Sequence, residues 1–167
     1  LPAAAAPARR RAGGAAALVG ASGSTGVSTA NASGVSGAIL GGFEFTTATV
    51  NLTSTVNAKL GANADVSAGT NVTVSANSAL NGAGVADVAA GGIVGYGDGD
   101  AYLTLNNTVG ALIGSGAQVT AGQDVVVSAT SDQMAASNTE SVGGGGIAGA
   151  DADTTAQLWH STKVDIG

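Results

Sequence analysis

A repeat of 53 residues is the feature that most constrains the fold of this chain. Residues 58–78 align without a gap to residues 111–131, and 11 of the 21 positions are identical. The same offset aligns residues 48–56 with residues 101–109 and with residues 154–161. A fixed period of strand-like residues is typical of stacked units, none of which buries its apolar face alone. The chain therefore contains about three copies of one structural unit.

The first copy follows the repeat less closely than the others. Residues 19–24 align only weakly with residues 72–77 at the same offset. We expect residues 1–37 to form a degenerate first repeat with a flexible Ala- and Arg-rich N-terminal segment, and residues 38–167 to form regular repeats. The basic triplet Arg9–Arg11 belongs to this first segment, where we expect a solvated tail; a small phosphate-binding arm is the alternative.

Small apolar residues alternate with polar residues within each unit, which is the period of a β-strand with one buried face. Gly, Thr, Asn and Val are abundant in these blocks, and all of them disfavour the interior of a helix. The alternation predicts an all-β chain. The residues that it places inward include Ala48, Val50, Leu52, Val72, Val74, Ala76, Ala101, Leu103, Leu105, Val125, Val127 and Ala129.

Short strands, Gly-rich corners and a long repeat together predict a parallel β-helix, or β-solenoid. A coil of the usual kind has roughly twenty to twenty-five residues, so we expect each 53-residue repeat to form two to three coils. An antiparallel sandwich or barrel is the alternative. It requires hairpin turns of the Asn-Gly type, and "LNGAG" at residues 80–84 is the one good candidate.

Two Gly-rich segments interrupt the Val-rich blocks at equivalent places, residues 90–102 and residues 142–154. Such segments form either flexible loops or faces at which backbones pack closely. Both continue directly into an alternating block, which favours close packing. Phosphate-loop and dinucleotide-binding motifs are excluded, because no Lys-Ser/Thr pair follows and no long helix is predicted.

Charge and composition restrict the partners. From residue 12 onward, Lys59 and Lys163 are the only Lys or Arg residues and they face eleven acids, so this part repels nucleic acids and anionic membranes. The chain has no Cys, which excludes disulfides and thiolate metal sites. No run of 18 apolar residues exists. We expect neither nucleic-acid binding nor membrane insertion of this segment.

Residues for catalysis are scarce, and we expect no enzyme activity. A polysaccharide lyase on this fold needs a general base and cations that neutralise a uronate. The candidates are Lys59, Lys163 and His160, and the repeat partners of His160 are Asn107 and Ser54. A surface-strand role is the expected one for His160. Trp159 is a candidate platform for stacking a sugar, and a plain strand-face residue is the alternative.

The strongest metal candidate is a repeated pair of carboxylates. Asp98 and Asp100 recur as Asp151 and Asp153, and stacked carboxylates offer the oxygen ligands that Ca²⁺ prefers. The pattern departs from the calcium-binding nonapeptide repeat at Tyr96 and at Asp98. We therefore expect a solvated acidic corner without a cofactor, with calcium as the alternative.

The repeats resemble those of a known family. "GANADVSAGTNVTVSANS" and "GSGAQVTAGQDVVVSATS" are each followed by a Gly-rich stretch and then by "TVGALIG" or "KVDIG". These units resemble the repeats of large secreted Gram-negative adhesins, namely filamentous-haemagglutinin and leukotoxin-type exoproteins and autotransporter passengers, over most of residues 38–167. The resemblance implies a right-handed parallel β-helix that projects from the bacterial cell surface and mediates adhesion or assembly. It implies no catalytic residue.

These observations predict a non-enzymatic structural protein, an extracellular β-solenoid that acts as an adhesin stalk or as a self-associating filament subunit. Its expected partners are a second copy stacked end to end or further repeats of a longer chain, together with cell-surface glycans or proteins. A carbohydrate-binding or polysaccharide-cleaving β-helix is the alternative. An ice-binding solenoid needs a regular Thr-x-Thr array, and "TTATVNLTST" at residues 46–55 is a single irregular stretch.

Overall fold

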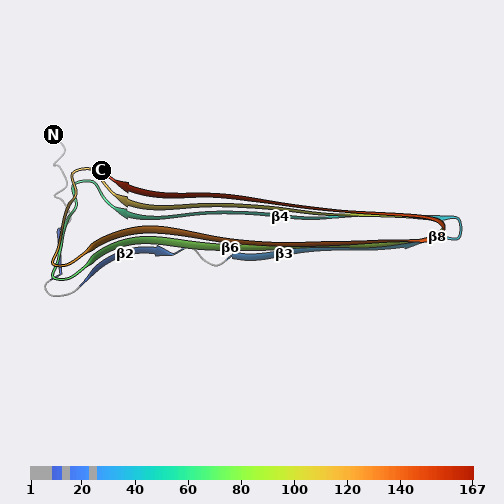
Figure 1. The fold of residues 1–167 in the computed structure, drawn as a ribbon, viewed down its shortest axis with the longest axis horizontal. Coiled ribbons are helices and arrows are strands. Elements are labelled where there is room, and N and C mark those ends of the chain that lie inside the picture. The colour runs from blue at the N-terminus through green and yellow to red at the C-terminus, as the bar shows by residue number, and fades with distance from the viewer. Residues whose placement is uncertain (1–8, 13–15, 23–25) are drawn as a thin grey trace, which may run out of the picture.

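The computed structural model describes residues 9–12, 16–22 and 26–167 of the chain. It is an all-β structure, and no helix occurs among these residues. Every strand pairing between them is parallel. The molecule is long and flat, with two layers of strands that extend from one end (Figure 1). Parallel pairing excludes the antiparallel sandwich that the sequence left as an alternative.

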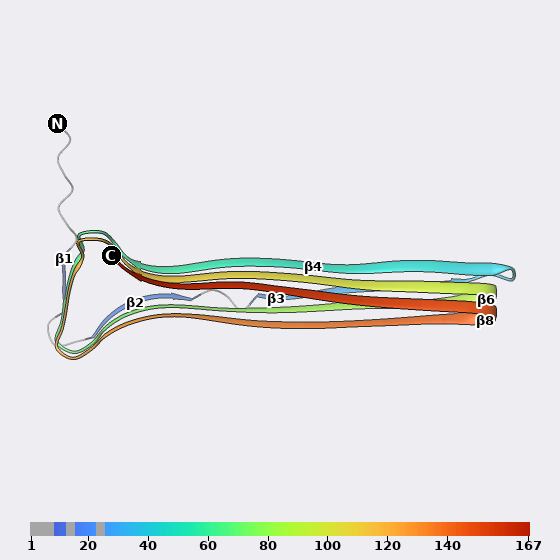
Figure 2. The same ribbon diagram turned by 45° about the horizontal axis from the view of Figure 1, so that its top comes forward.

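The chain winds through three similar circuits. The first contains β1 (Arg9–Ala12), β2 (Ala17–Ser22), β3 (Gly26–Gly37) and β4 (Gly41–Leu60). The second contains β5 (Asp65–Ala68) and the 42-residue β6 (Val72–Ile113), and the third contains β7 (Gln118–Ala121) and the 42-residue β8 (Val125–Ile166). In each circuit the chain runs outward in one layer, turns at the far end and returns in the other layer (Figure 2).

We name the parts of a circuit as follows. The outbound arms are β2, β3, residues 72–91 of β6 and residues 125–144 of β8. The return arms are β4, residues 94–113 of β6 and residues 147–166 of β8. The far turns join the two arms, and the short strands β1, β5 and β7 form a small sheet at the near end.

The predicted offset of 53 residues is confirmed as the register between neighbouring strands. Val72 pairs with Val125, and Leu60 pairs with Ile113. The prediction of two to three coils per repeat is wrong, because residues 53 apart are direct neighbours in the sheet and each repeat therefore completes one circuit. The usual coil length misled the prediction, since each arm here is about twenty residues long and not a short strand.

The first circuit departs from this register. Val19 pairs with Val74, and Gly26 pairs with Leu80, so the offset is 55 in β2 and 54 in β3 before it reaches 53 in β4. The weak alignment of residues 19–24 with residues 72–77 was therefore shifted by two positions. The flexible segment expected at the N-terminus falls mainly on residues 1–8, which lie outside the described residues.

The alternation of inward and outward residues is confirmed in the second circuit, which lies between the other two. Its inward side chains are buried, and Leu103 and Leu105 are the largest of them. The core is thin because the inward residues are mostly Ala, Val and Gly. The main apolar cluster gathers at the near end and contains Val56, Ala58, Leu60, Val66, Ala68, Val72, Val74, Ala76, Val109, Ala111 and Ile113.

Glycines form the far turns and also allow the two layers to approach. Gly92 and Gly145, at equivalent places in two circuits, have φ angles of 149° and 147°, which L side chains rarely adopt. A Cβ at Gly95 would lie 2.6 Å from the carbonyl oxygen of Gly144 and 3.0 Å from that of Ala90. The expected close packing of the Gly-rich segments is confirmed at Gly95, and these segments also turn the chain.

No helix within the described ranges has the length and apolar character that crossing a membrane requires.

Candidate functional site

The third circuit exposes a long strand edge. Within the described part of the chain, β8 pairs with β6 along one side only. Its inward side chains are covered by the second circuit alone, and Val125, Leu158, Val164 and Ile166 remain substantially exposed. We call this surface, residues 125–166 with their free backbone groups, the β8 edge. Unpaired strand edges are the part of a sheet that accepts a further strand.

The parallel pairing of β8 with β6 determines which backbone N–H and C=O groups are free along the β8 edge. Gly167 donates its N–H to the carbonyl oxygen of Ile113. In a parallel pair, alternate residues direct their N–H and C=O groups toward the same neighbour. The backbone N–H and C=O groups of odd-numbered residues in the return arm of β8, such as Gln157, therefore point toward β6. Those of even-numbered residues, such as Ala156, point toward the open side. These even-numbered residues are also the ones whose side chains point inward.

A column of polar side chains runs through the interior. Ser54 lies 3.2 Å from Ser78 of the second circuit, oxygen to oxygen, and Asn107 donates from Nδ2 to Oγ of Ser131 in the third circuit at 2.9 Å. Ser78 and Asn107 are buried, so these hydrogen bonds offset part of the cost of removing their polar groups from water. Oδ1 of Asn107 is buried and has no hydrogen-bond partner within the described residues. The pairing register places His160 next in the column after Ser54 and Asn107.

His160 therefore lies on the inward side of β8, where no further circuit covers it among the described residues, so it is an exposed strand residue as the sequence predicted. Ser131, Gln133, Leu158 and His160 line a common cavity in the third circuit. Gln133 donates from Nε2 to the carbonyl oxygen of Trp159 at 2.8 Å, which joins the two layers there. The sequence already indicated this position. Leu158 is the inward residue between Gln157 and Trp159, and period-2 alternation places His160 on the same side as Leu158.

The three candidate residues for catalysis do not form one site. Lys163 follows His160 by an odd number of positions, so the two side chains lie on opposite faces of β8. Nζ of Lys163 contacts Oδ2 of Asp165 at 2.8 Å on the exposed surface. That hydrogen bond, together with the charge of Lys163, lowers the pKa of the Asp165 carboxyl. Lys59 lies in β4 of the first circuit, two strands away from Lys163.

All five aromatic residues of the chain lie on one surface, the outer face of the return arms. Phe43 and Phe45 belong to β4, Tyr96 and Tyr102 to β6, and Trp159 to β8. Phe45 and Trp159 are 65% and 61% exposed. The rings of Phe45 and Tyr96 lie 6.0 Å apart and are tilted by 47°. We call this surface the aromatic face.

Four carboxylates lie on the aromatic face between these rings. Asp98 pairs with Asp151 and Asp100 pairs with Asp153, as the repeat predicted, so the four form a two-by-two array on adjacent strands. Loss of hydration raises the pKa of Asp98, and repulsion from the other three carboxylates raises it further. The pKa of Tyr102 is raised mainly by the negative charge of Asp100.

The expected calcium alternative has no added support from this array. No group of three or more His, Cys, Asp or Glu side chains within the described residues is gathered closely enough to hold a metal ion. In the first circuit, Phe45 and Thr47 occupy the positions that pair with Asp98 and Asp100, so the array is two strands wide.

The raised pKa of Asp98 predicts a pH dependence of stability. The folded state binds a proton at Asp98 more readily than the unfolded chain, for which 3.8 is the ordinary value. The free energy of unfolding should therefore fall as the pH rises from 3.8 through the raised pKa. Urea unfolding of the wild type and of Asp98→Asn across this range measures the effect. We expect the wild type to lose stability relative to Asp98→Asn, and a difference that does not change with pH contradicts the prediction.

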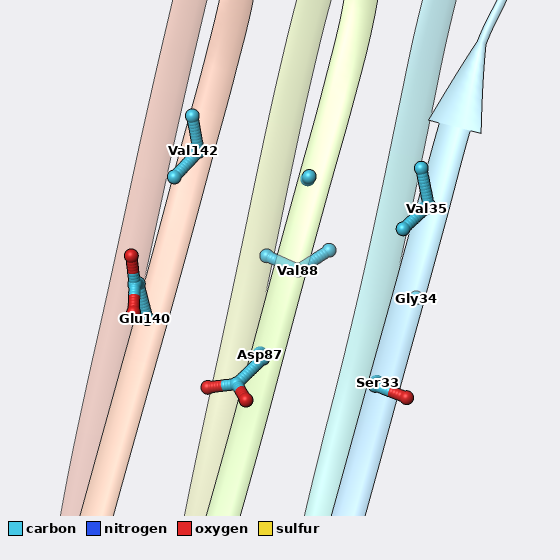
Figure 3. A pocket seen from close by; sticks show the side chains of 8 residues that line it. Ser33, Gly34, Val35, Asp87, Val88, Glu140 and Val142 are labelled. Atoms are coloured by element: carbon cyan, nitrogen blue, oxygen red, sulfur yellow. The ribbon is translucent and has the colours of Figure 1, made fainter.

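The outer face of the outbound arms carries a shallow groove of different character. Figure 3 shows Ser33, Asp87 and Glu140 on neighbouring strands, with Val35 and Val142 beside them. Asp87 pairs with both Ser33 and Glu140 in the register of the sheet. This groove combines acidic and aliphatic side chains, and it has no aromatic residue.

The basic triplet lies at the near end of the first circuit. The backbone of Arg9–Arg11 forms most of β1 and pairs in parallel with Asp65–Ser67 of β5. This part of the chain therefore belongs to the small near-end sheet. The expected flexible tail is therefore wrong for these residues, because their backbone is paired in a sheet. The alternative of a phosphate-binding arm stays a prediction.

No family model, curated protein or solved structure matches the chain.

Proposed function

We propose that this chain is a β-solenoid segment of a secreted bacterial surface protein, with a structural and non-enzymatic role as an adhesin stalk or a self-associating filament subunit. The resemblance of its repeats to those of large Gram-negative adhesins supports the extracellular location. The register of 53 residues that β4, β5 and β6 each keep with the next circuit supports the solenoid, because it allows one circuit to stack on the next without a change of geometry.

The β8 edge is the observation that carries the proposal. It presents free backbone groups along 42 residues, together with inward apolar side chains that are only partly covered. Strand edges that avoid association are usually blocked by Pro, by Lys or by bulges. The only prolines of the chain are Pro2 and Pro7, and Lys163 is the only Lys in β8.

The first circuit offers the complementary surface. Within the described residues, β2, β3 and β4 pair with β6 along one side only. A second copy that places β4 and β3 against the β8 edge would continue the same parallel ladder. The interior column favours this arrangement as well, since Ser54 and Asn107 each contact a serine of the next circuit, and His160 occupies the next position in that column.

A pair of proline variants tests end-to-end association. Ala156 directs its N–H to the open side, so Ala156→Pro removes a donor that only an added strand would use. We expect the wild type to form stacked particles in sedimentation velocity and electron microscopy. Ala156→Pro should shift it to single particles of unchanged thermal stability.

Gln157→Pro is the matched control, one residue further along the same strand. Gln157 directs its N–H toward β6, so this change removes a hydrogen bond within the molecule and should cost about 1–3 kcal/mol of folding stability. Wild-type protein that remains a compact single particle at high concentration would refute self-association. If Ala156→Pro still assembles, the contact between copies does not use the β8 edge.

A further inference from the structure

We propose that the aromatic face binds a linear polysaccharide that carries free amino groups. The proposal goes beyond end-to-end association and does not depend on it, because this face runs parallel to the stacking direction and stays exposed when another circuit covers the β8 edge. It rests on the placement of the aromatic residues, on their spacing and on the sign of the charge between them.

The placement of the aromatic residues is selective. They make up only 3% of the chain, yet all five lie on the outer face of the return arms and none lies on the outbound arms or in the core. Phe43 and Phe45 are exposed in β4, and Trp159 is exposed in β8. The core takes no aromatic residue, and the one ring pair, Phe45 and Tyr96, lies on the outer surface. Exposed aromatic side chains gathered on a single face are available to contact a ligand.

The spacing of the rings suits an extended ligand. Phe43 pairs directly with Tyr96, Tyr102 follows Tyr96 by six residues, and Trp159 pairs with Asn106 four residues further along. At about 3.3 Å per residue, the rings cover a distance of about 33 Å on a flat sheet. Protein partners are usually held by aromatic anchors clustered in a central pocket. Separate platforms in a row fit a stiff repeating polymer, whose sugar rings stack their C–H faces on them.

The residues between the rings supply hydrogen bonds. Thr49 and Thr155 flank Tyr102 on the neighbouring strands, and Asn51 and Gln157 flank Thr104. Their side chains point outward, and they offer both donors and acceptors to sugar hydroxyl groups.

The charge of the face selects the class of polysaccharide. Asp98 and Asp100 lie between Tyr96 and Tyr102 along β6, and Asp98 pairs directly with Phe45. Asp151 and Asp153 are their partners in β8. The basic side chains on this face, Lys59 and Lys163, are near the opposite end of the arms, and Lys163 contacts Asp165. Uronate polymers are therefore repelled, whereas an ammonium group would gain both carboxylate contacts and cation–π contacts.

Titration calorimetry with three hexasaccharides of equal length tests the proposal: β-1,4-linked glucosamine, its N-acetylated form and a polyguluronate fragment. We expect the glucosamine hexasaccharide to bind more tightly than the acetylated one, and the polyguluronate not to bind. Binding should weaken as salt is added, because these charges are exposed. Equal binding of the charged and acetylated forms would overturn the cationic part of the proposal.

Variants on the two outer faces separate the roles of rings and charges. Tyr102→Ala should weaken binding about two- to fivefold, as expected for one exposed cation–π contact, and Tyr102→Phe should retain it. The double variant Asp98→Asn/Asp151→Asn should weaken binding of the glucosamine form by up to about tenfold. It should leave the acetylated form unaffected.

The matched controls are Asp87→Asn/Glu140→Gln, an adjacent carboxylate pair on the outer face of the outbound arms, and Met134→Ala, an exposed residue of that outbound face. Neither should change binding. If the control pair weakens binding as much as Asp98→Asn/Asp151→Asn, or if Tyr102→Ala has no effect, the ligand is held by general charge attraction and the aromatic face is not its site.

Discussion

Leu105→Ala should lower the free energy of unfolding by about 2–5 kcal/mol, the usual cost of a buried Leu-to-Ala change that leaves a cavity. Leu105 is fully buried and packs with Val50, Leu80 and Leu103 in the middle of the arms. Few other large side chains support this region, because most inward positions are Ala, Val or Gly. Neighbouring residues of such small size cannot collapse into the space, so the cost should lie in the upper part of the range.

Leu158→Ala is the control for this prediction. Leu158 pairs with Leu105 in the register and occupies the same column one circuit further on, but it is 44% exposed. The same substitution should therefore cost much less in single particles. Urea unfolding of both variants measures the difference, and equal costs would show that the second circuit is not the core of the fold. In stacked particles the cost of Leu158→Ala should rise, because an added circuit would bury this side chain.

Gly92→Ala is expected to have the second-largest effect. The φ angle of 149° at Gly92 alone costs about 1–3 kcal/mol for a residue with a Cβ. The added Cβ would also collide with the carbonyl oxygen of Ala38 and would lie 3.3 Å from Cα of Gly41. Both are backbone atoms of the preceding circuit, which cannot move without disturbing the far turn.

Gly91→Ala is the matched change one residue earlier. A Cβ there meets nothing closer than the carbonyl oxygen of Gly144 at 3.9 Å. We expect the melting temperature to fall strongly for Gly92→Ala and only slightly for Gly91→Ala. Similar melting temperatures for the two variants would mean that the far turn does not require a glycine at residue 92.

The sequence predicted the strand content and the register, because both depend on local repetition. Val72 and Val125 are identical in type and occupy equivalent places in the repeat, so their pairing followed from the alignment alone. The number of circuits per repeat did not follow from it. That number depends on where the chain turns, and Gly92 and Gly145 were interpreted as sites of close packing and not also as corners.

The functional surfaces were predicted only in part. Trp159 was recognised as a candidate sugar platform, and Asp98 and Asp151 were correctly aligned as neighbours. The grouping of Trp159 with Phe43 and Tyr102 was missed. These residues are far apart in the sequence, and they share a surface only because three return arms lie side by side. That arrangement follows only if each repeat forms a single circuit, which the sequence did not predict.

The shape of one circuit determines how the molecule would grow with added repeats. Each circuit adds about 4.8 Å in the stacking direction, whereas one arm of about twenty residues spans about 66 Å. About fourteen circuits are therefore needed before the stack is as tall as it is wide. With few repeats, extra sequence enlarges a plate, and each added circuit widens both outer faces by one strand. Height in the stacking direction would require many residues, while the area for contact increases from the first added repeat.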